Sequence, residues 1–140
     1  MGLKPFIYLL FFLSVAPPDE PSKTHPVTIP AQVVENMFYA HAVTKDGVEL
    51  NFYTDSGGGP AQIWRSAADQ LRLTTTKVHV DGKDWEQVKL PAFLPGKGIP
   101  LPLSSDGKFI VTSNENSMAS PGDDVSGMLG RNWFADRVWT

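Results

Sequence analysis

The chain has 140 residues and a formal net charge of −3, a length that suits a single domain. Its 12 Lys and Arg residues are scattered, so nucleic acid is not expected as a partner. Because the sequence contains no cysteine, disulfides, thiolate catalysis and cysteine-ligated zinc are excluded.

Residues 1–16 have the order of an export signal. Lys4 precedes the apolar run Phe6 to Val15, which is too short for an ordinary membrane span, and Ser14-Val15-Ala16 resembles a cleavage site. Pro17 should hinder cleavage there, so the segment is either cut elsewhere or kept as an N-terminal anchor. A buried N-terminal strand is the alternative. We expect an exported protein, periplasmic or secreted, with or without a membrane tether.

A proline-rich linker, residues 17–26, separates this segment from the predicted domain, residues 27–140. Val48, Leu50 and Phe52 alternate with less apolar neighbours, which predicts a strand with one apolar face. Lys45-Asp46-Gly47 and Asp81-Gly82 predict hairpin turns. The predicted strands cover residues 27–34 (an edge strand or bulge at Pro30), 37–43, 48–53, 77–80, 85–90 and 107–112, with a last strand starting at residue 137. Residues 125–129 form another apolar run, which ends at Gly130.

Two helices are predicted between these strands. Gln62 to Leu73 is the longer, with Ser66 as its cap, and Asn132 to Asp136 is a short one. Residues 91–102 are rich in Pro and Gly and predict a long loop. Together these patterns predict an all-β fold, a small closed barrel-like lobe with one or two short helices.

Asp55 is the main candidate for chemistry. It follows the alternating strand directly and precedes Ser56-Gly57-Gly58-Gly59, where glycines allow a tight turn and close approach of another chain. A lone exposed carboxyl group is ionised near neutral pH. Two carboxyl groups that share a site cannot both ionise, so one can activate water while the other donates a proton.

The stretch FYAHAVTKDGVELNFYTDSGGG, followed by AADQLRL, resembles the start of a retropepsin-like or pepsin-like aspartic peptidase lobe. That family combines a hairpin, an apolar strand and an Asp-Thr/Ser-Gly triplet. Near the end of the lobe, two apolar residues and a glycine pack behind the Asp loop; here they are Met128, Leu129 and Gly130, followed by RNWF as a short helix.

The resemblance implies that Asp55 is catalytic, that Ser56 braces two facing loops, and that Gly57 completes the triplet. It implies a peptide or protein substrate and neither a metal nor an organic cofactor. Gly58 and Gly59 depart from the usual Ala or Ser after the triplet. No second triplet occurs in the sequence, and the chain stops at Thr140 where the family's lobe continues. A second aspartate is therefore expected from a second lobe of a longer protein or from an identical subunit.

Other interpretations of these residues stay open. Asp55 is alternatively a solvated carboxylate in a glycine-rich turn, in a non-catalytic exported β-domain that binds a peptide or protein partner. The three histidines lack metal-ligand spacing, and Ser66 and Ser126 lack a nucleophile-elbow pattern. The glycine run Gly57 to Gly59 lacks the Lys-Ser/Thr ending of a phosphate loop. The four tryptophans are expected in the core or at a lobe interface: Trp64, Trp85, Trp133 and Trp139.

Overall fold

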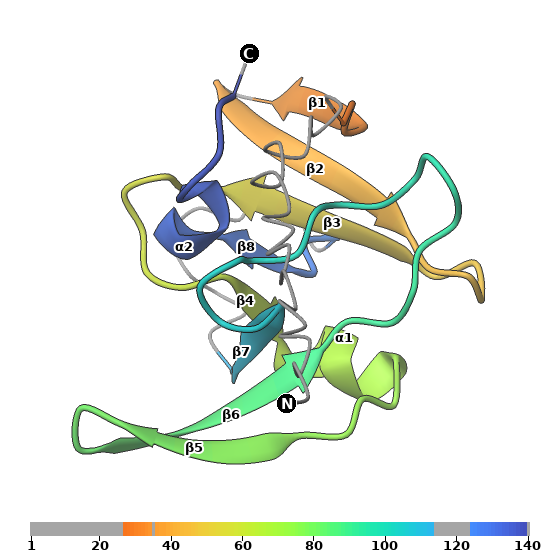
Figure 1. Cartoon of the computed structure of the whole chain (residues 1–140). Coiled ribbons are helices and arrows are strands. Elements are labelled where there is room, and N and C mark those ends of the chain that lie inside the picture. The colour runs from red at the N-terminus through yellow and green to blue at the C-terminus, as the bar shows by residue number, and fades with distance from the viewer. Residues whose placement is uncertain (1–26, 35, 114–123, 140) are drawn as a thin grey trace, which may run out of the picture.

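The computed structural model describes residues 27–34, 36–113 and 124–139, which form eight strands and two short helices (Figure 1). The predicted signal segment and linker lie outside the described residues. The strands are β1 (Ala31–Val34), β2 (Met37–Val43), β3 (Glu49–Thr54), β4 (Gln62–Trp64), β5 (Thr76–Val80), β6 (Lys83–Lys89), β7 (Lys108–Thr112) and β8 (Gly127–Leu129). The helices are α1 (Arg65–Gln70) and α2 (Arg131–Phe134).

One sheet contains all eight strands, in the order β1-β2-β3-β8-β4-β7-β6-β5. Strand β8, from near the end of the chain, lies between β3 and β4. It runs parallel to β3, with Thr54 opposite Leu129, and antiparallel to β4, with Gln62 opposite Met128. This insertion separates two strands that follow each other in sequence and brings residues 127–132 against the segment that joins them.

The predicted all-β class is confirmed, but the closed barrel is not. β1 and β5 are the two edges of the described sheet and do not pair with each other. The β5–β6 hairpin instead extends away from the other strands (Figure 1). The described sheet is therefore open.

The sheet is buried on both faces at its centre. On one face Leu50, Phe52 and Leu129 belong to the main core cluster, together with Trp133 from α2. Neighbouring residues in the same strands point to the other face, where a second cluster forms from Tyr39, Tyr53, Trp64 and Met128. The predicted single apolar face of β3 is therefore incomplete, because a central strand with a parallel neighbour is covered on both sides.

The predicted helix from Gln62 to Leu73 is wrong at both ends. Residues 62–64 are strand β4, and α1 covers only Arg65–Gln70. Ser66 does not cap the helix, because the N-cap is Trp64, without a side-chain hydrogen bond. Ile63 and Trp64 are buried, so pairing with β7 and β8 overrides the local helical preference.

Two predicted strand segments are also wrong. Residues 27–30 precede β1 and are not strand, and neither are residues 137–139. The carbonyl oxygen of Pro30 accepts a hydrogen bond from the N–H of His41 at 2.8 Å. Pro30 therefore lies beside β2 and accepts one hydrogen bond from it. It does not extend the β1–β2 ladder, since proline has no N–H to donate. The predicted helix at residues 132–136 forms one residue earlier, as α2.

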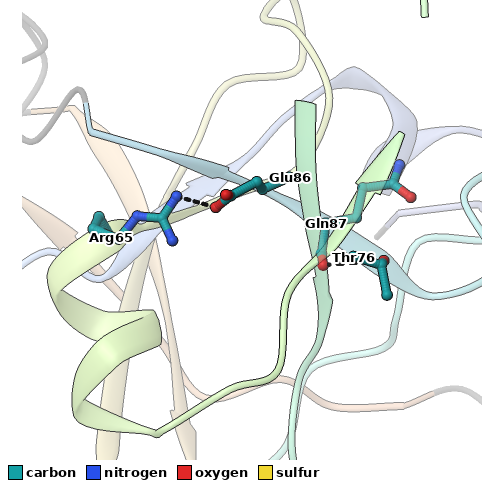
Figure 2. A network of polar contacts seen from close by, with 4 residues as sticks. All are labelled: Arg65, Thr76, Glu86 and Gln87. Carbon is teal, nitrogen blue, oxygen red and sulfur yellow. Dashed lines mark hydrogen bonds and ion pairs between the residues drawn. The ribbon is translucent and has the colours of Figure 1, made fainter. Parts of the chain in front are cut away.

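The hairpin predicted at Asp81-Gly82 is confirmed. Both residues have positive φ, 52° and 74°, as a two-residue hairpin turn requires. Thr76 Oγ1 donates a hydrogen bond to the carbonyl oxygen of Gln87 across the hairpin at 3.4 Å (Figure 2). Figure 2 also shows an ion pair between Arg65 at the start of α1 and Glu86 of β6, which ties the hairpin to the helix.

Candidate functional site

Asp55 lies immediately beyond β3, at the end of the parallel pair with β8. Its backbone N–H donates a hydrogen bond to the carbonyl oxygen of Leu129 at 3.0 Å. The ladder between β3 and β8 is therefore continued by one bond into residue 55. The strand pairing fixes the backbone from which the carboxylate projects.

The first residues of the loop turn back on Asp55. The carbonyl oxygen of Asp55 accepts from the N–H of Gly58 at 3.0 Å, and its Oδ1 accepts from the N–H of Gly57 at 3.1 Å. Asp55, Ser56 and Gly57 are exposed, and Gly58 is half-buried. The carboxylate is thus held at the surface by the backbone of its own turn.

The far end of the loop is held by α2 and the residue before it. The N–H of Arg131 donates to the carbonyl oxygen of Gly59 at 2.9 Å. Asn132 Oδ1 accepts from the N–H of Ala61 at 2.6 Å. Gly130 lies so close to the loop that a Cβ atom there would overlap Gly59 and Pro60 backbone atoms.

The structure thus brings together both groups of residues singled out in the sequence, Asp55 to Gly58 and Met128 to Gly130. Met128 points into the second core cluster and Leu129 into the main one. Sequence reasoning missed Ala61, Arg131 and Asn132, which also hold the loop. An amide side chain in the first turn of a predicted helix is only a weak sign of a long-range hydrogen bond, because the sequence does not show which residue it bonds to.

An apolar groove lies next to this loop. Its volume is about 560 Å³, and Thr54, which precedes Asp55, forms part of its wall. The residues that line it come from the chain before β1, from β1–β3, and from α2 and the segment after it: Val27, Thr28, Ile29, Ala31, Phe38, Ala40, Thr54, Trp133, Phe134 and Trp139. In Figure 1 the segment after α2 runs towards β1.

Arg137 contacts Trp133, which is one of the residues that line the groove. Its guanidinium donates to the carbonyl oxygens of Trp133 and Leu101 and lies 6.0 Å from the centre of the Trp133 ring. Burial lowers the pKa of Arg137, an effect partly opposed by Asp136. These contacts hold the end of α2, so we assign Arg137 a role in stabilising the fold.

Ser66, Ser126 and the four tryptophans lie in the core or on the surface. Ser126 is buried, and its Oγ accepts from the N–H of Asn51 at 3.1 Å, while Ser66 is exposed on α1. Trp64 and Trp133 are buried, whereas Trp85 and Trp139 are partly exposed. Within residues 27–34, 36–113 and 124–139, no three His, Cys, Asp or Glu side chains gather as a metal site would need.

His79 Nδ1 lies 2.6 Å from Asp84 on the exposed hairpin, whereas His41 is half-buried in β2 and His25 lies outside the described residues. None of the described helices is long and apolar enough to cross a membrane. Comparison of the chain with known protein families, curated proteins and solved structures found no match.

Proposed function

We propose that this chain is one lobe of an aspartic endopeptidase, with Asp55 as one of two catalytic carboxyl groups. The second aspartate comes from another lobe or from an identical subunit. The observation that supports this most is the placement of Asp55. Its carboxylate stands at the exposed end of a buried strand, in a loop held at its start by Leu129 and at its end by Arg131 and Asn132.

The open position of the loop suits a shared site. Asp55, Ser56 and Gly57 are all exposed, so a second loop of the same kind can approach them. In an enzyme with both carboxyl groups, Ser56 would brace the two loops against each other. No metal or organic cofactor takes part.

The proposed reaction hydrolyses a peptide bond with two carboxyl groups that share one proton. The ionised carboxylate takes a proton from water, whose oxygen bonds to the scissile carbonyl carbon. The protonated carboxyl group gives its proton to the carbonyl oxygen, which forms a diol. The C–N bond then breaks as the nitrogen takes the proton from the first carboxyl group. The second carboxylate takes a hydroxyl proton from the diol, which restores both groups.

The test is cleavage of an unfolded protein at acidic pH by the wild type, Asp55→Asn and Asp46→Asn. Asp46 is the matched control, because it is an exposed aspartate in a hairpin turn. We expect Asp55→Asn to lose activity by about 1,000-fold or more, since the amide cannot take the proton from water. Asp46→Asn should match the wild type. Equal activity of all three proteins would remove Asp55 from the mechanism.

The source of the second aspartate can be tested by dilution. An enzyme formed from two identical subunits loses specific activity when it is diluted below the dissociation constant of the dimer. A two-lobe enzyme keeps it. If the reading frame continues past Thr140, a second Asp-Thr/Ser-Gly triplet there would supply the missing carboxyl group.

We also propose that residues 1–16 direct export of the protein. Cell fractionation with and without these residues tests this. A full-length protein that stays in the cytoplasm would contradict it.

A non-catalytic β-domain that binds a peptide or protein partner is the second candidate. The groove beside Thr54 favours it, because its lining is mostly apolar and includes the exposed side chains of Phe38 and Trp139. Binding of this kind would not depend on the Asp55 carboxylate, so Asp55→Asn would keep the function unchanged.

A further inference from the structure

The loop from Asp55 to Ala61 is fastened at both ends to one short segment, residues 129–132. The N–H of Asp55 bonds to the carbonyl oxygen of Leu129 at the start of the loop. The carbonyl oxygen of Gly59 bonds to the N–H of Arg131 near its end. Both bonds join backbone atoms, so they do not depend on which side chains stand there.

The third fastening is different because it uses a side chain. Asn132 Oδ1 accepts from the N–H of Ala61 at 2.6 Å. Ala61 is fully buried, with 0% exposure, so water cannot replace this acceptor without opening the structure. The carbonyl oxygen of Ala61 in turn accepts from the N–H of Ile110 in β7 at 3.0 Å. Ala61 is thus held from α2 on one side and from the sheet on the other.

We infer that Asn132 is a positioning residue for the catalytic loop, acting on Asp55 through the N–H of Ala61. Asp55 begins the loop and Ala61 ends it. Leu129 fixes the start of the loop and the backbone of Arg131 holds Gly59, so the path of the last residues depends on where Ala61 is held. Of the three fastenings to residues 129–132, only the one from Asn132 uses a side chain that a substitution can remove.

This inference rests on the proposed peptidase function, and its kinetic signature follows from the geometry. Loss of the Asn132 acceptor should shift the loop that carries Asp55, while the side chains that line the neighbouring groove stay unchanged. We therefore expect kcat to fall at least about tenfold in Asn132→Leu, because a small displacement of a catalytic group is enough for that. KM should stay within about twofold of the wild-type value.

Rescue by a conservative variant separates this role from a general loss of packing. Asn132→Asp keeps an oxygen that can accept from Ala61, so its kcat should return to within about threefold of the wild type. Gln70→Leu is the control, since it also replaces an amide side chain with leucine but stands exposed on α1. All four proteins are compared at a temperature where circular dichroism shows them folded.

A second readout does not need activity. Amide hydrogen exchange of Ala61, followed by NMR, should be slow in the wild type and in Asn132→Asp. It should be at least about tenfold faster in Asn132→Leu, because the N–H has lost its acceptor. If neither this chain nor a longer protein that contains it cleaves the substrate, the proposed function fails, and this measurement still decides whether Asn132 holds the loop.

Two kinds of result would overturn the inference, one from the kinetics and one from hydrogen exchange. One is a kcat of Asn132→Leu equal to that of the wild type, or a kcat of Asn132→Asp as low as that of Asn132→Leu. The other is exchange of the Ala61 amide at the same rate in the wild type and in Asn132→Leu.

Discussion

The carboxylate of Asp55 lies against the backbone of Gly58. A Cβ atom added at Gly58 would come within 2.7 Å of Oδ2 and 2.8 Å of Cγ of Asp55. The φ angle of Gly58 is not positive, so the backbone there does not itself require glycine. Glycine at position 58 is therefore explained by the space that the Asp55 carboxylate occupies.

This relationship predicts the effect of Gly58→Ala. The new methyl group should force the carboxylate or the loop to move, and we expect the free energy of unfolding to fall by about 1–3 kcal/mol. If Asp55 is catalytic, activity should fall as well, by about tenfold or more. Chemical denaturation and a peptide-cleavage assay measure the two effects.

Gly59→Ala is the matched control for that experiment, since its Cβ would lie an ordinary 3.7 Å from Gln62 Nε2. Its unfolding free energy should stay within about 0.5 kcal/mol of the wild type. In an Asp55→Ala background most of the Gly58→Ala cost should vanish, because the clashing atoms are gone. A cost that is the same in both backgrounds would place its cause elsewhere.

Local signals in the sequence predicted local structure well. The turn at Asp81-Gly82 forms as predicted because its chemistry is contained in two residues that accept positive φ. The alternation of Leu50 and Phe52 likewise marks β3, since both side chains enter the core. The position of Asp55 directly after this strand could be read from the sequence for the same reason.

Long-range pairing explains what the sequence did not show. Strand β4 was predicted as helix because Gln62 and Trp64 carry no local mark of their partners in β7 and β8. The contact of Asn132 with Ala61 was missed for a similar reason, as it depends on β8 lying between β3 and β4. The spacing of apolar residues can indicate whether a segment is a helix or a strand. It does not indicate which other strands that segment pairs with in the folded protein.

Gly130→Ala should be among the more damaging single substitutions in this chain. Its Cβ would overlap the carbonyl oxygen of Gly59 and come within 2.8 Å of that of Pro60, and these are backbone atoms that cannot rotate away. We expect a loss of about 2–4 kcal/mol in the free energy of unfolding.

Gly57→Ala gives the comparison for Gly130→Ala, because a Cβ at Gly57 would meet Asp55 Oδ1 at 3.7 Å. Urea denaturation of both variants should show a cost for Gly57→Ala below about 1 kcal/mol. Similar costs for the two would mean that Gly130 does not pack against the loop as described.

The ion pair between Arg65 and Glu86 should contribute little to stability. Both side chains are about a third or more exposed, at 40% and 32%, so water and salt screen the attraction. A double-mutant cycle with Arg65→Met and Glu86→Gln should give a coupling of about 0.2–1 kcal/mol that shrinks with added salt. A coupling that is larger and independent of salt would contradict this view of the α1–hairpin contact.

Two phenylalanines on neighbouring strands should differ sharply in their response to alanine. Phe52 of β3 is 0% exposed, and its ring centre lies 5.8 Å from that of Phe109, so Phe52→Ala leaves a cavity in the main core. We expect a loss of about 3–5 kcal/mol. Phe38 of β2 is 59% exposed, and Phe38→Ala should cost less than about 1 kcal/mol. Thermal and urea unfolding of the two variants measure this difference, and a large cost for Phe38→Ala would show that a partner covers this residue in solution.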